Sequence, residues 1–248
     1  MYRLQLHIRV GQNIVPQIQP GVMTKRFHAF IFSVIQRIDP QFAVDLHNRK
    51  KRQLFSFFID EDRILIHSPN KRVIQCLQQG LFEVERIDLR DWKGRIQEMH
   101  CKQIHESDIE AAFSTYVTLH FLTPTTFCHG KIYYPLPELY RVFTSANKAY
   151  EMATDLMVPP EQLQAIAYRI RIDYLNLQSK QVNFDSFRIN GFTGKLELSL
   201  KTLTDQEQQL AWKLLVYGSL MGIGYKTAWG MGQTRIEPFE QKHFSNSR

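Results

Sequence analysis

Apolar and polar residues alternate at the start of the chain. Residues 2–10, YRLQLHIRV, follow the two-residue period of a half-buried strand. After a loop that holds Pro16, Pro20 and Gly21, apolar residues recur at three- and four-residue intervals. These residues predict an amphipathic helix, and they are Phe27, Phe30, Ile31, Val34, Ile35 and Ile38.

The pattern then changes to short strands around a turn. Residues 54–59 and 63–67 are apolar arms on either side of the acidic turn at 60–62, which predicts a β-hairpin. Residues 73–81 predict a short helix that ends at Gly80, and residues 82–89, FEVERIDL, predict another strand. The order of elements in the first half is therefore βαββαβ.

A polar stretch at 103–112 separates this set from a second one. Strands are predicted at 114–122 and 168–175, a helix at 137–154, and a hairpin on either side of residues 191–194 with its second arm at 195–201. Thr204 and Glu207 form a capping box for a helix through Gly218, and residues 233–238 close the chain as a strand. The second half thus repeats βαββαβ, with an inserted helix.

Two similar α+β halves predict tandem ferredoxin-like, or RRM-like, domains. We place the first at residues 1–105 and the second at 112–240, with a C-terminal glycine-rich loop at 222–232.

Composition narrows the class of protein. The 248 residues are 44 % hydrophobic, which supplies a core and excludes a disordered or collagen-like chain. The three cysteines form no CxxC pair, so neither a disulfide framework nor a zinc knuckle is predicted. No apolar run approaches the ~18 residues of a membrane span, and the first residues lack the apolar core of a signal peptide, so we expect a cytoplasmic protein without a membrane partner.

Positive charge is concentrated near the N-terminus. The formal net charge is +7, and residues 20–52 contain seven Lys or Arg against Asp39 and Asp45. This excess favours a polyanionic partner, although a solvated basic face explains the charge alone equally well.

The glycine-rich loop is the most informative segment. Gly222, Gly224, Gly230 and Gly232 fall within eleven residues, in a pattern that matches neither a dinucleotide fingerprint nor a P-loop. Glycines at these places allow positive φ and a nest of N–H groups that can hold phosphates, with Lys226 adding charge. The structural alternative is a tight helix-to-strand connection with Trp229 in the core.

A second candidate site is a histidine followed by four cations. His47, Arg49, Lys50, Lys51 and Arg52 lead into the apolar segment LFSFF. The positive electrostatic potential of these cations attracts phosphate. Because imidazole titrates near neutrality, His47 can exchange a proton with a ribose hydroxyl. An exposed polar loop with an incidental histidine is the alternative.

On the first helix, Lys25, His28 and Phe32 lie to one side of the apolar stripe. His28 is a candidate second imidazole, catalytic or in contact with RNA, and Lys25 is a candidate RNA contact; a merely solvated histidine is the alternative. The acidic turn at 60–62 is typical of hairpins, so we assign no metal and no cofactor.

Three segments, in this order and spacing, resemble a known family. They are DLHNRKKRQLFSFF after the first helix, FLTPTTF with the later PLPELYRVF, and the loop GIGYKTAWGMG. Together they are similar to the CRISPR-associated repeat-processing endoribonucleases, the Cas-six family of the RAMP superfamily. The glycine pattern is shared with related RNA-binding Cas subunits, so it identifies the superfamily better than the activity.

The resemblance implies tandem ferredoxin-like domains and metal-independent cleavage of CRISPR repeat RNA. The 2′-hydroxyl attacks, a 2′,3′-cyclic phosphate is left, and the mature CRISPR RNA can stay bound in an effector complex with other Cas subunits. The resemblance places a general acid-base histidine at His47. The family's tyrosine and lysine positions fall on Phe32 and Gln53, so the full triad is absent. Arg52 or Lys51 then supplies the cation, with His28 as second imidazole.

Two other functions stay open. A non-catalytic, structural RNA-binding subunit of an effector complex fits the incomplete triad. A general single-strand RNA-binding module fits less well because no RNP1-like motif is present.

Overall fold

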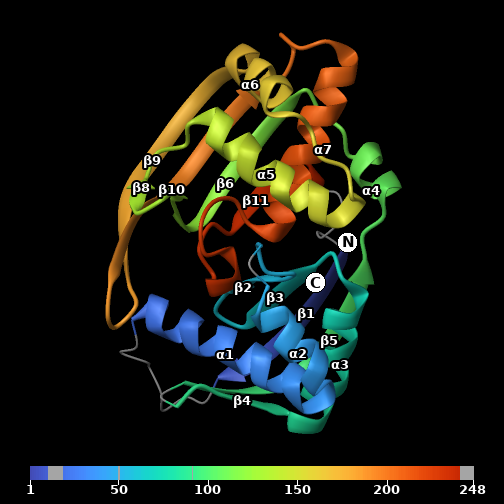
Figure 1. Ribbon diagram of the computed structural model, residues 1–248, viewed down its shortest axis with the longest axis vertical. Coiled ribbons are helices and arrows are strands. Elements are labelled where there is room, and N and C mark those ends of the chain that lie inside the picture. Colours follow the sequence, from blue (N-terminus) through green and yellow to red (C-terminus); the bar gives the residue numbers. More distant parts are fainter. Residues whose placement is uncertain (11–18, 50, 91, 241–248) are drawn as a thin grey trace. The chain divides into compact units, whose positions relative to one another are not determined.

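The computed structural model describes residues 1–10, 19–49, 51–90 and 92–240 (Figure 1). The chain divides into two units. The first consists of residues 1–103, 182–188 and 228–230, and the second holds the rest of the described chain. Two short segments from the second half thus belong to the first unit. The predicted domain limits, residue 105 at the end of the first domain and residue 112 at the start of the second, stay a prediction.

The first unit contains a ferredoxin-like sheet. Among the described residues its antiparallel strands have the order β2-β3-β1-β5-β4. The strands are β1 (Tyr2–Val10), β2 (Ser56–Ile59), β3 (Arg63–Ser68), β4 (Arg86–Asp88) and β5 (Lys93–Gln103), and the helices are α1 (Pro20–Ile38), α2 (Pro40–His47) and α3 (Lys71–Val84). Without α2 and the edge strand β4 the order is βαββαβ, as predicted, but its last strand is β5 rather than residues 82–89.

Alternation along β1 separates the core face of this sheet from its other face. Leu4, Leu6 and Ile8 are buried in one core cluster with the apolar stripes of α1 and α3. Because successive strand residues point to opposite faces, Gln5 and His7 lie on the face away from these helices. Figure 1 shows α1 and α3 beside the strands of this sheet.

Three predictions in the first half are wrong in detail. Residues 40–47 form α2, which was not predicted. The helix at 73–81 does not end at Gly80 but continues to Val84, so the strand expected at 82–89 is reduced to β4. The fourth strand of the ferredoxin-like order is β5, a polar strand that pairs with β1.

The second unit repeats the topology with insertions. Its main sheet has the strand order β11-β6-β10-β9 among the described residues. The strands are β6 (Tyr116–Thr125), β7 (Phe127–His129), β8 (Ile132–Tyr134), β9 (Arg171–Asn183), β10 (Arg188–Ser199) and β11 (Thr234–Glu237); the helices are α4 (Glu106–Ala111), α5 (Leu139–Thr154), α6 (Pro160–Arg169), α7 (Asp205–Met221) and the 3-10 turn η1 (Thr227–Trp229). The last two residues of β9, the first residue of β10 and the last two residues of η1 belong to the first unit.

The α+β fold class is confirmed, and the hairpin prediction is corrected. Helices α5 and α7 pack so closely that a Cβ on Gly218 would lie 2.8 Å from the Cβ of Ala146. Gly191 and Gly194 lie inside β10 rather than in a turn, and the turn between β9 and β10 is at 184–187. No helix in the described ranges is long and apolar enough to cross a bilayer.

Candidate active site

His28 on α1 is held by a backbone carbonyl. Its Nδ1 lies 2.8 Å from the carbonyl oxygen of Ala228, which belongs to the first unit. Because a carbonyl oxygen can only accept, Nδ1 carries the proton in this contact. In the neutral imidazole the lone pair is therefore on Nε2, the atom that can take up or return a proton.

Phe32 lies between the two candidate imidazoles. One helical turn after His28, its ring centroid is 5.0 Å from that of His28 and 5.6 Å from that of His47. The imidazole centroids are thus within about 11 Å of each other, the sum of those distances. His28 is half-buried, whereas His47, the last residue of α2, is exposed. The structure thus brings together two histidines that lie on two successive helices.

Asp39 fixes the start of the helix that carries His47. Its carboxylate accepts a hydrogen bond from the backbone N–H of Phe42 and pairs with Arg72. The Phe42 bond, and after it this ion pair, lower the pKa of Asp39 against an opposing effect of burial. Pro40 at the first position of α2 defines where the helix begins, and His47 is its last residue.

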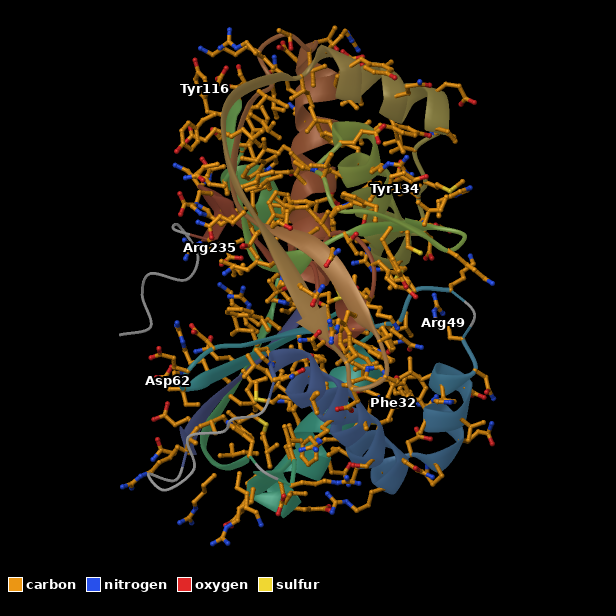
Figure 2. All side chains as sticks on the ribbon, turned by 90° about the vertical axis from the view of Figure 1, so that its left-hand side faces the viewer. Phe32, Arg49, Asp62, Tyr116, Tyr134 and Arg235 are labelled. Carbon is orange, nitrogen blue, oxygen red and sulfur yellow. The ribbon has the colours of Figure 1, made fainter. Side chains whose placement is uncertain are left out.

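The basic segment after α2 contributes a buried cation. Burial of the guanidinium lowers the pKa of Arg52 to about 10, although the residue as a whole is half-buried. Arg49 donates from Nε to the carbonyl oxygen of Arg52 over 3.0 Å, and Lys51 is exposed. Lys50 lies outside the described residues. Figure 2 labels Arg49 on this segment and Phe32 on α1.

Phe55, which follows the basic segment, contacts His28 and Phe32. Its buried ring lies 5.6 Å from the ring of His28 and 5.7 Å from that of Phe32. Arg52 precedes it by three residues in the chain. Gln53, at the family's lysine position, has a buried Oε1 without a hydrogen-bond partner in the described chain.

Trp229 packs beside His28 rather than standing clear of the protein. Its ring lies 5.7 Å from that of His28 and 5.6 Å from that of Phe184, and it is packed against the core of the first unit. Sequence reasoning missed both this contact and the one with Phe55. Only the aromatic residue type gave a signal, because the sequence does not show which rings meet.

The glycine-rich loop takes the backbone conformation that its glycines permit. Gly222, Gly224, Gly230 and Gly232 all have positive φ, at 77°, 103°, 77° and 65°. They are also closely packed: a Cβ on Gly232 would lie 2.0 Å from the carbonyl oxygen of Ile223. These glycines are therefore explained by the conformation and packing of the loop.

The N–H groups of this loop are largely used inside the protein. Gly224 donates to the hydroxyl of Ser145 over 2.7 Å, and Gly232 donates to the carbonyl of Pro124 over 3.1 Å. Gly222 has a longer contact, 3.4 Å, with the carbonyl of Ser219. This geometry does not favour a phosphate nest at these three glycines. The side chain of Lys226, 5.2 Å above the ring of Tyr225, is the cation that the loop offers.

The sequence and the fold are similar to those of known proteins. A family model for the CRISPR-associated endoribonuclease Cas6 matches residues 119–234. A Cas6 endoribonuclease of Streptococcus thermophilus is 23 % identical over 226 residues, which is 86 % of this chain and 90 % of the relative. The chain is thus similar to Cas6 endoribonucleases over most of its length.

Other Cas6 proteins extend the similarity. A Mycobacterium tuberculosis Cas6 is 29 % identical over 119 residues, covering 48 % of this chain and 38 % of the relative. The product complex of a Thermus thermophilus Cas6 has a TM-score of 0.77 at 20 % identity, covering 95 % of this chain and 99 % of the other. A RAMP protein binding different RNA substrates has a TM-score of 0.65 at 13 % identity, covering 95 % and 99 %. These likenesses confirm the predicted ferredoxin-like fold.

These similarities confirm the resemblance and the endoribonuclease class. The roles of the individual residues stay predictions. The structure places His28, His47 and the segment of Arg52 around Phe32 and Phe55, and it puts Lys25 one turn before His28.

Proposed function

We propose that this protein acts as a Cas6 endoribonuclease and cleaves CRISPR repeat RNA by attack of a ribose 2′-hydroxyl on the adjacent phosphodiester, without a metal ion. The observation that supports this most is the pair of imidazoles in contact with Phe32. The reaction needs a base for the 2′-hydroxyl and an acid for the leaving 5′-oxygen. Imidazole performs either task near neutral pH.

His47 is the primary proton-transfer group because it is exposed where an RNA strand can reach it. His28 is the second imidazole, oriented by the carbonyl of Ala228 so that Nε2 exchanges the proton. Arg52 stabilises the charge that develops on the phosphate in the transition state. A desolvated guanidinium suits this role, since an anion restores the favourable interaction that burial removed.

RNA binding is assigned to cations of the first unit and to one of the second. Lys25, Arg49 and Lys51 neutralise phosphates, as does Lys50, which lies outside the described residues; Lys226 adds one further contact. Solved relatives are described as a product complex and a substrate mimic complex, which supports repeat RNA as the substrate here. Retention of the product among other Cas subunits in the cytoplasm is part of the proposal.

The test is a single-turnover reaction with repeat RNA from the same genome, in EDTA. We expect one cut and a 2′,3′-cyclic phosphate on the upstream product. RNA with a single 2′-deoxyribose before the cut should bind with the same affinity and stay intact, because it lacks the nucleophile. This matched substrate separates binding from chemistry.

Cleavage of the deoxy substrate, or cleavage only with Mg²⁺, would contradict the mechanism. Tight, salt-sensitive binding without any cut would support the alternative function, a non-catalytic structural subunit of an effector complex. That alternative is favoured by one observation, that Phe32 and Gln53 stand where the family has a proton-transfer residue and a cation.

A further inference from the structure

Two neighbouring strands of the first unit carry a histidine-rich cluster on the face away from the core helices. His7 on β1 is the direct partner of Glu98 on β5, and His100 follows Glu98 by two residues. Residues two apart on a strand share a face, and direct partners across an antiparallel pair lie side by side. The register of two central strands therefore holds all three side chains together.

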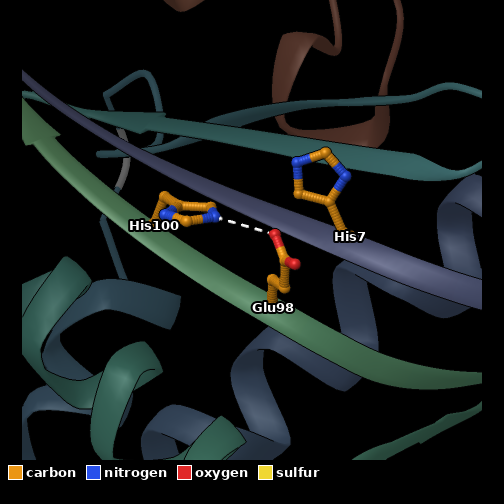
Figure 3. Close-up of side chains that lie close together, drawn as sticks. All are labelled: His7, Glu98 and His100. Carbon is orange, nitrogen blue, oxygen red and sulfur yellow. Dashed lines mark hydrogen bonds and ion pairs between the residues drawn. The ribbon is translucent and has the colours of Figure 1, made fainter. Parts of the chain in front are cut away.

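Their ligand atoms already lie close to one another. One nitrogen or carboxylate oxygen from each of His7, Glu98 and His100 falls within 4.8 Å of the other two. Nε2 of His100 is 3.1 Å from the carboxylate of Glu98 (Figure 3), and the two imidazole centroids are 5.9 Å apart. Tetrahedral coordination at about 2.0–2.1 Å separates ligand atoms by about 3.3 Å. Glu98 and His100 are exposed and can move that far by small side-chain rotations.

The electrostatics of the cluster favour a cation. The described side chains offer Glu98 no Lys or Arg within ion-pair distance; its recorded partner is His100. Arg63, the partner of His7 on the other side of β1, is already paired with Asp60 and Asp62. A carboxylate beside two imidazoles thus lacks a permanent positive partner.

We propose that His7, Glu98 and His100 bind a divalent transition-metal ion of the Zn²⁺ type. Two imidazoles and one carboxylate are a ligand set that Zn²⁺ accepts with water at a fourth position, while Mg²⁺ and Ca²⁺ prefer oxygen ligands alone. Bound there, the ion links β1 to β5. This site is separate from the imidazoles at Phe32, since it lies on the face of the sheet away from α1.

Gln5 is the positioning residue of this site. Its side-chain amide lies 2.8 Å from Nε2 of His7. When the metal takes Nδ1 of His7, Nε2 carries a proton, and the amide oxygen of Gln5 accepts it after a rotation of the amide. Metal-binding histidines commonly donate their second N–H to such an oxygen, which fixes the ring.

The test uses untagged, chelator-treated protein and ZnCl₂ alone, followed by calorimetry and thermal melting. We expect one Zn²⁺ per chain and a rise in Tm. His100→Ala should abolish both effects, and Gln5→Ala should weaken binding about 10- to 100-fold. His129→Ala, which removes an exposed histidine of the second unit, should bind Zn²⁺ like the wild type. Co²⁺ in place of Zn²⁺ should give the visible spectrum of a nitrogen- and oxygen-ligated ion.

Absence of Zn²⁺ binding, or binding that His100→Ala and His129→Ala leave equally intact, would overturn the proposal. RNA cleavage in EDTA provides an independent readout. His100→Ala should cleave at the wild-type rate, because the metal site does not take part in the chemistry. If that variant stopped cleaving, the cluster would belong to the RNA site and the metal assignment would be wrong, whatever the outcome for His47.

Discussion

His28 is oriented by a carbonyl 200 residues away in the sequence. The helical spacing of α1 places His28 and Phe32 on one arc, and this much follows from the sequence. The partner of His28 does not, because no local pattern indicates that Ala228 and Trp229 pack against this helix. Contacts between distant segments are therefore what sequence reasoning lacked at this site.

Replacement of His28 by two different residues separates orientation from proton transfer. Asparagine keeps a donor near the place of Nδ1, whereas alanine leaves the Ala228 carbonyl without this donor. His28→Asn should melt close to the wild type and cleave about 10²- to 10⁴-fold more slowly. His28→Ala should cleave as slowly and also lose about 1–3 kcal/mol of stability. Single-turnover cleavage beside thermal melting measures both, and a His28→Asn variant of wild-type rate would remove His28 from the chemistry.

At the scale of elements, the start of α7 contributes to the stability of the fold in a way that depends on pH. Glu207 pairs with Arg169 and accepts from the backbone N–H of Thr204 over 3.0 Å. These contacts, the ion pair first, lower the pKa of Glu207 to about 2 from the ordinary 4.5. A carboxyl group whose pKa is lower in the folded than in the unfolded protein stabilises the fold at pH values above the unfolded pKa. This stabilisation disappears as the pH falls from about 4.5 through 2.

Glu207→Gln should therefore lower Tm at neutral pH by about 2–4 °C, which corresponds to about 1 kcal/mol for a capping residue in a protein of this size. The difference from the wild type should shrink between pH 4.5 and 2. Melting curves of both proteins across that range measure it. A difference that stays constant with pH would contradict the assigned ion pair.

A second prediction at the scale of elements compares the cost in stability of a Cβ at Gly232, in the glycine-rich loop, with the cost at Gly130. Gly232 and Gly130 both have positive φ, but a Cβ on Gly130 meets nothing within 4 Å, whereas on Gly232 it meets the Ile223 carbonyl. Gly130→Ala should cost about 1–2 kcal/mol for the backbone conformation alone. Gly232→Ala should cost clearly more.

Thermal melting ranks the two variants, and an RNA titration of folded Gly232→Ala tests the loop's role. Because the N–H groups of the loop are bonded inside the protein, we expect the folded variant to bind RNA with normal affinity. A loss of affinity without a loss of stability would instead restore the phosphate nest.

Helices and strands were predicted from the sequence where one face of the element is apolar, and they were missed where no face is. β1, α1 and α7 were predicted because their buried residues repeat at the strand or helix period. β5 was missed because KGRIQEMHCKQ exposes most of its side chains. For α2 a signal was present, since Asp39 followed by Pro40 is typical of a helix start. Gly191 and Gly194 indicated a turn, but they allow close approach of neighbouring backbone inside β10.

For the whole molecule, the positive charge predicts salt-sensitive RNA binding. Changing Arg49 and Lys51 together to glutamine removes two phosphate contacts. The slope of log affinity against log salt should become less steep by about 1.4, the value for two contacts with a single strand. Changing Lys71 and Lys93 to glutamine removes the same net charge from other parts of the first unit and should leave the slope nearly unchanged. Equal effects of both double variants would show that only the net charge matters.

The most direct test of the proposed mechanism is the cleavage rate of His47→Ala on repeat RNA in EDTA, under single-turnover conditions with enzyme in excess. If His47 transfers the proton, the rate falls about 10²- to 10⁴-fold while RNA affinity hardly changes, because the imidazole acts in the chemical step. Cleavage by His47→Ala at the wild-type rate would contradict the central claim.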